Sequence, residues 1–200
     1  GRVIVDAQGN PKHSATSEYL GNYQPDFLAT LGTELTISKR LSVRALLDGK
    51  KGGVFYSGTK LSTVNNGTAL TTLLNYREAF VGPNSVQEDG NGGYVANTTP
   101  IAVYPYFHDQ VASAYLLDAS YLKLREVAVS YSIPTGKMGG AVRSITVGVF
   151  AKNLKYWVAK ENTFADPEVG GVGAASDAVG IETTTTPTAK SFGAEIRLNF

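Results

Sequence analysis

The sequence contains no cysteine, which excludes disulfide frameworks, thiol nucleophiles and cysteine-ligated metals. Only 18% of its 200 residues are charged, below the roughly 25% of typical soluble domains, and the formal net charge is +1. Lysine and arginine are scattered rather than clustered, so no nucleic acid partner is indicated. No apolar run approaches the roughly 18 residues of a transmembrane helix. The first residues lack the apolar core of a signal peptide, so we expect the beginning of an exported protein to lie outside this sequence.

Glycine and tyrosine are abundant, with 22 and 11 residues, and this mixture favours strands joined by glycine-rich turns. The clearest strand covers 190–200, where apolar and polar residues alternate. A period of two is typical of a strand whose two faces meet different surroundings. A tilted strand needs roughly 9–11 residues to cross a bilayer, whereas strands of soluble proteins usually have about 5–6. The length of this segment therefore favours a membrane-spanning strand.

Four more segments alternate in the same way, namely 26–38, 41–48, 121–134 and 144–154. The connections between these strands are alternately short and long, since 49–119 and 155–189 separate the pairs. Transmembrane barrels combine short periplasmic turns with long extracellular loops, and one set of strand directions satisfies this rule throughout. The sequence therefore predicts an all-β fold made of antiparallel strands of a transmembrane β-barrel with long extracellular loops.

The polar faces of these strands carry charges of both signs, and we predict that they face the lumen of the barrel: Glu34, Arg44, Asp48, Lys152, Glu195 and Arg197. The opposite faces have no charge through the strand middles, where a lysine or arginine facing lipid costs about 2–4 kcal/mol. Tyr121, Lys123 and Arg125 share the spacing of Val127 and so fall on the apolar side. We expect them near the outer end, where an aromatic girdle and long basic side chains are tolerated.

The segment Asp118–Pro134 closely resembles a late-barrel motif of the SusC/RagA family of TonB-linked outer-membrane transporters. Further segments resemble family motifs in the same order along the chain: Gly21–Phe27, Gly52–Ser57, Lys152–Leu154, Asp166–Glu168 and Ser191–Phe200. The match departs at Lys152, where the family usually has arginine or glycine, and 169–186 matches no pattern. The ordered set is specific even though each motif alone is weak.

The resemblance implies a 22-stranded barrel with a plug in the Gram-negative outer membrane, energised by TonB. It implies a SusD-like surface lipoprotein as partner, oligosaccharides or peptides as substrates, and contact with outer-membrane lipid. On this basis 1–200 is expected to be the C-terminal portion of the barrel, with the plug, the TonB-contacting segment and the N-terminal strands outside it. Phe200 then resembles the C-terminal signal for outer-membrane assembly.

No enzymatic site is indicated, and we expect no cofactor. Two histidines without cysteine make a zinc site of three or four ligands improbable on composition. The segment Asp89–Gly93 has the oxygens and glycines of a calcium loop but lacks its terminal glutamate, so a plain turn is favoured. No phosphate loop, nucleophile elbow or fixed carboxylate pair occurs.

Aromatic residues in the predicted loops form the one candidate binding set: Tyr104, Tyr106, Tyr156 and Trp157. Their rings suit stacking on a sugar or packing on a protein partner, but they also suit a loop core or the membrane girdle. A different interpretation of the whole chain is a soluble β-sandwich that binds a ligand through its long loops. The two interpretations differ in the uncharged, strand-long face of 192–200.

Overall fold

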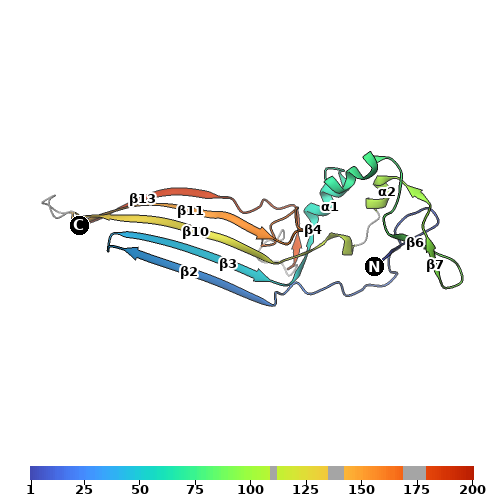
Figure 1. Cartoon of the computed structure of the whole chain (residues 1–200), viewed down its shortest axis with the longest axis horizontal. Helices are drawn as coiled ribbons and strands as arrows, with labels where there is room; N and C mark the ends of the chain where they lie inside the picture. Colours follow the sequence, from blue (N-terminus) through green and yellow to red (C-terminus); the bar gives the residue numbers. More distant parts are fainter. Residues whose placement is uncertain (109–111, 135–141, 169–178) are drawn as a thin grey trace. The chain divides into compact units, whose positions relative to one another are not determined.

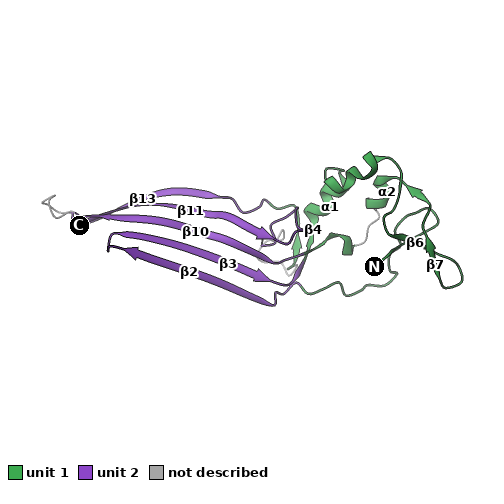
Figure 2. Ribbon diagram, in the orientation of Figure 1, with its two compact units in different colours: residues 1–22, 55–117, 170–185 green, residues 23–54, 118–169, 186–200 purple. Residues whose placement is uncertain are grey.

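The computed structural model describes residues 1–108, 112–134, 142–168 and 179–200 (Figure 1). The chain forms two compact units, each built from segments that are far apart in the sequence (Figure 2). Unit 1 consists of residues 1–22, 55–117 and 170–185, and unit 2 consists of residues 23–54, 118–169 and 186–200.

Unit 2 contains a five-stranded antiparallel sheet with the order β13-β11-β10-β3-β2. Its strands are β2 (Phe27–Ile37), β3 (Leu41–Lys51), β10 (Tyr121–Ile133), β11 (Ser144–Val158) and β13 (Ser191–Asn199). These are the five strands expected from the alternating pattern, so the all-β prediction is confirmed. Strands β3 and β11 run further than predicted, into segments that had been assigned to loops.

A tight turn joins β2 to β3, as the sequence predicted. Ile37 pairs with Leu41, and Ser38 and Lys39 between them have left-handed φ values of 54° and 58°. Two successive left-handed residues give a hairpin the backbone twist that its strands require. The turn therefore forms without the asparagine-glycine pair that usually marks it.

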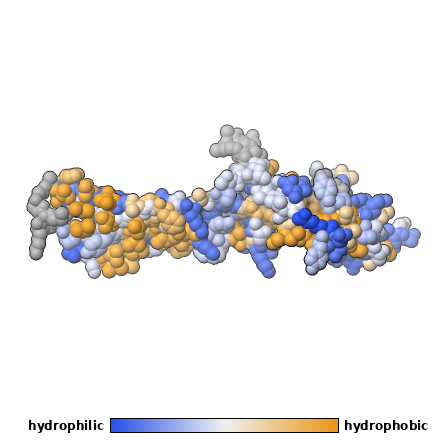
Figure 3. Space-filling model, turned by 90° about the horizontal axis from the view of Figure 1, so that it is seen from above, coloured by the Kyte–Doolittle hydropathy of each residue, from blue (hydrophilic) through white to orange (hydrophobic). Residues whose placement is uncertain are grey.

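The register of the sheet gives it one apolar and one polar face. Successive cross-strand partners place the aliphatic residues on one side, which we call the apolar face: Leu31, Leu35, Val43, Ala45, Leu47, Val127, Val129, Val147, Val149, Phe192, Ala194 and Ile196. Many of these side chains are exposed, with Val149 at 60% and Ile196 at 73%. Figure 3 shows hydrophobic residues gathered over the sheet. Exposed apolar patches of this kind mark surfaces that contact a partner or a membrane.

Unit 1 consists of short strands and helices. A three-stranded sheet contains β1 (Val3–Val5), β6 (Ser85–Glu88) and β7 (Tyr94–Ala96), and a second contains β4 (Val54–Ser57), β9 (Leu116–Asp118) and β12 (Ile181–Glu182). Strands β5 (Phe80–Val81) and β8 (Pro100–Ile101) form a pair. The helices are α1 (Gly58–Asn65), α2 (Val103–His108) and the 3-10 segments η1 (Leu70–Arg77) and η2 (Ala112–Tyr115). A small core of Phe80, Ile101, Val103 and Tyr106 holds this unit together.

A buried carboxylate links two segments of unit 1 that are far apart in the sequence. Glu182, only 2% exposed, accepts hydrogen bonds from the Ser57 hydroxyl at 3.0 Å, the Thr59 hydroxyl at 2.7 Å, and the backbone N–H groups of Thr59 and Thr185 at 3.0 Å. Ser57 is the N-cap of α1, so the carboxylate lies at the positive end of that helix. Burial acts to raise the pKa of Glu182, but these hydrogen bonds outweigh it and hold the pKa below its usual value.

Replacing Glu182 with glutamine is expected to destabilise the first turn of α1 by about 1–3 kcal/mol, because the new NH2 group meets hydrogen-bond donors. Hydrogen exchange of the Thr59 amide measures the effect and should become faster. The exposed Glu161 supplies the control, since Glu161→Gln should leave that rate unchanged. Equal exchange in both variants would show that the carboxylate does not hold the helix.

Candidate functional site

The polar face of the sheet carries the candidate site. A shallow cavity of about 220 Å³ on this face is lined by residues from all five strands, among them Glu34, Ser42, Arg44, Glu126, Phe150, Lys152 and Glu195. Arg44 forms an ion pair with Glu126, and the Ser42 hydroxyl donates a hydrogen bond to Glu34 at 2.8 Å. The cavity offers charged and hydroxyl groups to a polar solute.

The six residues predicted to face a lumen all lie on this polar face. Glu34, Arg44, Lys152 and Glu195 line the cavity. The Nη2 atom of Arg197 lies 3.9 Å from Oε2 of Glu195. Asp48 lies four residues after Arg44 in β3 and therefore on the same face. That this face borders a passage stays a prediction, which belongs to the function proposed below.

A β-bulge divides β10 into two parts. Leu124 pairs with Leu47 and Glu126 with the adjacent Leu46, so Arg125 is an extra residue without a partner in β3. The neighbouring β11 is also irregular here, because Asn153 has a left-handed φ of 53°. One extra residue exchanges the faces to which all the following side chains point.

The bulge overturns the predicted orientation of Tyr121, Lys123 and Arg125. Lys123 pairs with Asp48 and therefore lies on the polar face, not on the apolar face with Val127. Tyr121 lies on the polar face for the same reason, and Leu124 takes a place on the apolar face opposite Leu47. The bulge thus keeps Lys123 and Tyr121 off the apolar face.

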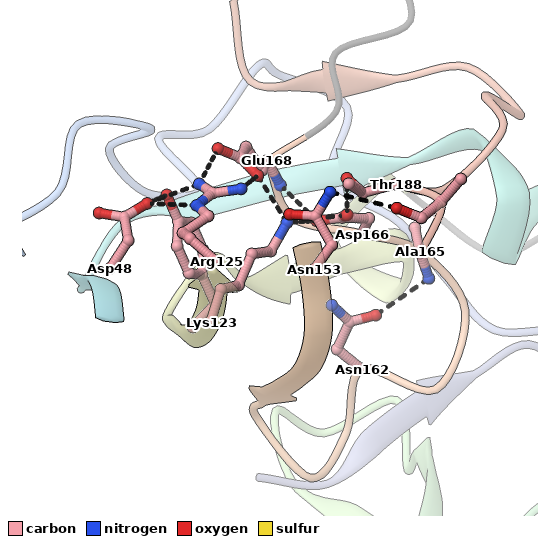
Figure 4. A network of polar contacts seen from close by, with 11 residues as sticks. Asp48, Lys123, Arg125, Asn153, Asn162, Ala165, Asp166, Glu168 and Thr188 are labelled. Atoms are coloured by element: carbon pink, nitrogen blue, oxygen red, sulfur yellow. Dashed lines mark hydrogen bonds and ion pairs between the residues drawn. The ribbon is translucent and has the colours of Figure 1, made fainter. Parts of the chain in front are cut away.

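Lys123 is the centre of a buried ion-pair network (Figure 4). Its Nζ atom lies 2.7 and 2.8 Å from the two carboxylate oxygens of Asp166 and 2.6 Å from Oε2 of Glu168. Lys123 is 2% exposed and Asp166 is 4% exposed. The three strong acceptors satisfy the ammonium group, which is the condition under which a charge is tolerated away from water.

Arg125 joins this network to the neighbouring strand. Its guanidinium donates to Oδ2 of Asp48 at 3.0 and 2.5 Å and forms an ion pair with Glu168. The Thr188 hydroxyl donates to Asp166 at 2.7 Å, and the Asn153 amide donates to the carbonyl oxygen of Ala189 at 3.1 Å. The segment that leaves β11 and the segment that enters β13 are thereby fixed to the sheet.

The carboxyl groups outside the strands respond to these cations. Burial acts to raise the pKa of Asp166, but hydrogen bonds from Lys123 and Thr188 outweigh it and hold the pKa below its usual value. Hydrogen bonds from Arg125, opposed by burial and aided by Lys123, likewise lower the pKa of Glu168. Both groups are therefore charged at neutral pH, and the network contains two cations and three carboxylates.

Sequence reasoning missed this network. Asp166–Glu168 was noted only as a family motif, and Lys123 and Arg125 were assigned to a membrane girdle. The available signal was the phase of the alternation, since the basic residues share the spacing of Val127 although their charge suits the opposite face. A bulge between them resolves that conflict.

The structure places the four loop aromatics in different surroundings. Tyr106 is 5% exposed and packs edge-on against Phe80, with ring centroids 5.1 Å apart, which corresponds to the loop core named above as the alternative to a binding role. Tyr156 and Trp157 belong to β11 rather than to a loop, and they pair with Lys123 and Leu122 on opposite faces of the sheet. Tyr104 is exposed and lines a second cavity of about 340 Å³ with Asn66, Arg77 and Phe107. Phe200 follows β13 and is exposed.

Metal-site and membrane-helix geometry give no further candidate. Among the described residues no three histidine, aspartate or glutamate side chains converge as metal ligands. No helix in the described part of the chain is long and apolar enough to cross a membrane.

No protein-family model matches the sequence, and a comparison with curated proteins finds no match. Solved structures of a RagAB peptide importer do match. The importer in its closed-closed state gives a TM-score of 0.61 at 21% identity, over 98% of this chain and 20% of the importer chain. The open-open state gives 0.64 at 19% identity, over 99% and 20%. A further RagAB transporter structure gives 0.57 at 21% identity, over 86% and 17%. The chain therefore shares the fold of these transporter segments and spans about a fifth of their length.

Proposed function

We propose that this chain forms part of the wall and the extracellular loops of a TonB-dependent importer in the Gram-negative outer membrane. The observation that carries the proposal is the exposed apolar face of the five-stranded sheet. In the middle of the strands this face carries no charged side chain, from Leu31 to Leu35 in β2, Val43 to Leu47 in β3, Val127 to Val129 in β10, Val147 to Val149 in β11 and Phe192 to Ile196 in β13. Strands β2, β3, β10, β11 and β13 have 9 to 15 residues, which suits a tilted crossing of a bilayer.

The shared fold supports the same proposal. The match to the RagAB importer covers nearly the whole chain, including the loops of unit 1. In this proposal the apolar face contacts lipid, the polar face borders the passage, and β2 and β13 pair with further strands of the complete protein. Because lipid offers no hydrogen bonds, strands that cross it must close into a barrel.

The substrate proposed is a large nutrient, either a peptide or an oligosaccharide. The matched transporter is described as a peptide importer. The polar face presents carboxylates, guanidinium groups and hydroxyls, which can form hydrogen bonds with either class. A SusD-like lipoprotein is the proposed partner at the outer mouth, and TonB is the proposed energy source through a part of the protein outside this chain.

Cell fractionation of the complete protein tests this function. We expect it in the detergent-extracted outer-membrane fraction, and we expect a surface lipoprotein to copurify with it. The segment 1–200 expressed alone should aggregate without detergent, because both its apolar face and its strand edges are uncovered. A monodisperse, folded 21.2 kDa protein in detergent-free buffer would instead support the soluble β-sandwich.

A further inference from the structure

We propose that residues 159–168, here called the strap, are fixed across the polar face of the sheet and narrow the outer end of the passage, with Lys123 as the positioning residue. The position of the strap on the polar face comes from contacts within unit 2 alone. Its effect on a passage rests on the function proposed above.

The anchors of the strap all lie on one face. Lys123 faces the polar side because of the bulge at Arg125, and its Nζ atom binds Asp166 and Glu168 of the strap. Arg125 binds Glu168 and also Asp48, which lies on the polar face of β3. The carboxylates of the strap are therefore held over the polar face, on the side of the sheet that is proposed to border the passage.

The strap also has internal structure. The side-chain oxygen of Asn162 accepts hydrogen bonds from the backbone N–H groups of Phe164 at 3.3 Å and Ala165 at 3.1 Å. The Asp166 carboxylate accepts one from the N–H of Glu168 at 3.1 Å. Asn162 is 4% exposed. These bonds hold the turn in shape independently of the ion pairs.

Burial distinguishes a fixed strap from a swinging one. To leave the sheet, the strap would separate Lys123 from Asp166, and each would lose its partner in surroundings where their side chains are 3% and 1% exposed. Segments that open readily have few buried contacts and solvent-exposed hydrogen bonds, which is the opposite of this arrangement. The strap is therefore a permanent part of the outer mouth rather than a lid.

Paired spin labels on the complete transporter in liposomes test this inference. One label replaces Thr163 in the strap, and the other replaces Ser130 on the polar face of β10. Since 1–200 contains no cysteine, labels are attached through introduced cysteines after removal of any elsewhere in the protein. We expect a single narrow distance distribution in the parent protein and a broad one after Lys123→Met.

Lys152→Met is the matched control, because Lys152 lies on the same face but the described structure gives it no ion pair, only an Nζ position 5.5 Å from the Phe150 ring centre. The distribution should stay narrow in this variant. A broad distribution in the parent protein, or a narrow one in Lys123→Met, would overturn the fixed strap. If Lys123→Met does not assemble, Asp166→Asn replaces it with the same expected broadening.

A single label at Val149 separates this test from that of the proposed function. A paramagnetic agent dissolved in lipid should increase the relaxation rate of a spin label at Val149. A water-soluble nickel complex should increase the relaxation rate of a spin label at Thr163. Failure at Val149 would reject the membrane location, whereas a narrow parent distance would still support the strap. Faster relaxation of the Thr163 label in the presence of the lipid-soluble agent would reject the position of the strap on the polar face.

Discussion

Replacing Lys123 with methionine is expected to lower the free energy of unfolding by about 3–5 kcal/mol, the usual cost of removing one partner of a buried ion pair. Asp166 would keep the Thr188 hydroxyl and the Glu168 N–H but would lose the ammonium group that binds both of its oxygens. Denaturant titration of the complete protein in detergent micelles measures the loss.

The control for this measurement is again Lys152→Met, which should change the free energy of unfolding by less than about 1 kcal/mol, in the range of surface interactions. Lys123→Arg should restore part of the lost stability, because it returns a positive charge to the same place. Similar unfolding midpoints for Lys123→Met and Lys152→Met would show that the network does not stabilise the fold.

Lowering the pH is also expected to reduce the free energy of unfolding of the parent protein. The folded pKa values of Asp166 and Glu168 lie below their usual values, so the unfolded chain takes up protons first as pH falls. The stabilisation is complete above the usual carboxyl range and is lost as pH falls through the folded values. Lys123→Met, which has already lost its ion pairs, should therefore be less sensitive to acid than the parent protein.

Replacing Val129 with arginine is expected to cost about 2–4 kcal/mol and to reduce the amount of assembled protein in the outer membrane, because its side chain lies on the apolar face in the middle of β10. The next residue, Ser130, points to the polar face. Ser130→Arg introduces the same charge one position away and should leave assembly nearly unchanged.

The yield of heat-modifiable, folded protein in outer-membrane fractions measures both variants. Equal yields would mean that the two faces meet the same surroundings, which is incompatible with a membrane wall. A large loss of folded protein in Val129→Arg alone rejects the soluble β-sandwich when the parent protein is recovered from membranes. The same samples are therefore fractionated.

Periodicity in the sequence was enough to predict the sheet. The alternation in β13 and β2 is uninterrupted, and each strand there has one pattern from end to end. The hairpin between the first two strands was also predicted, with Lys39 and Arg40 as its connection, although the structure places the left-handed residues at Ser38 and Lys39. Local patterns sufficed here because a strand with one buried or lipid-facing side repeats its constraint at every second residue.

Most of the network and the structure of unit 1 were beyond such reasoning. The partners Lys123 and Asp166 are 43 positions apart, and no local pattern links them. Glu182 and Thr59 are 123 positions apart. The sequence leaves a binding role and a loop core open for Tyr104 and Tyr106 alike, because nothing local distinguishes an aromatic residue that packs in a small core, as Tyr106 does, from one that remains exposed, as Tyr104 does.

The bulge at Arg125 adds one residue to β10 without interrupting the pairing of the residues on either side of it with β3. Deleting that one residue would leave Lys123 on the polar face and Leu124 opposite Leu47, because the two parts of the strand alternate in one phase once Arg125 is skipped. Between Leu124 and Glu126 the strand can therefore lose its extra residue without exchanging its faces, and an alignment that follows hydrophobic periodicity alone would be one residue out beyond this point.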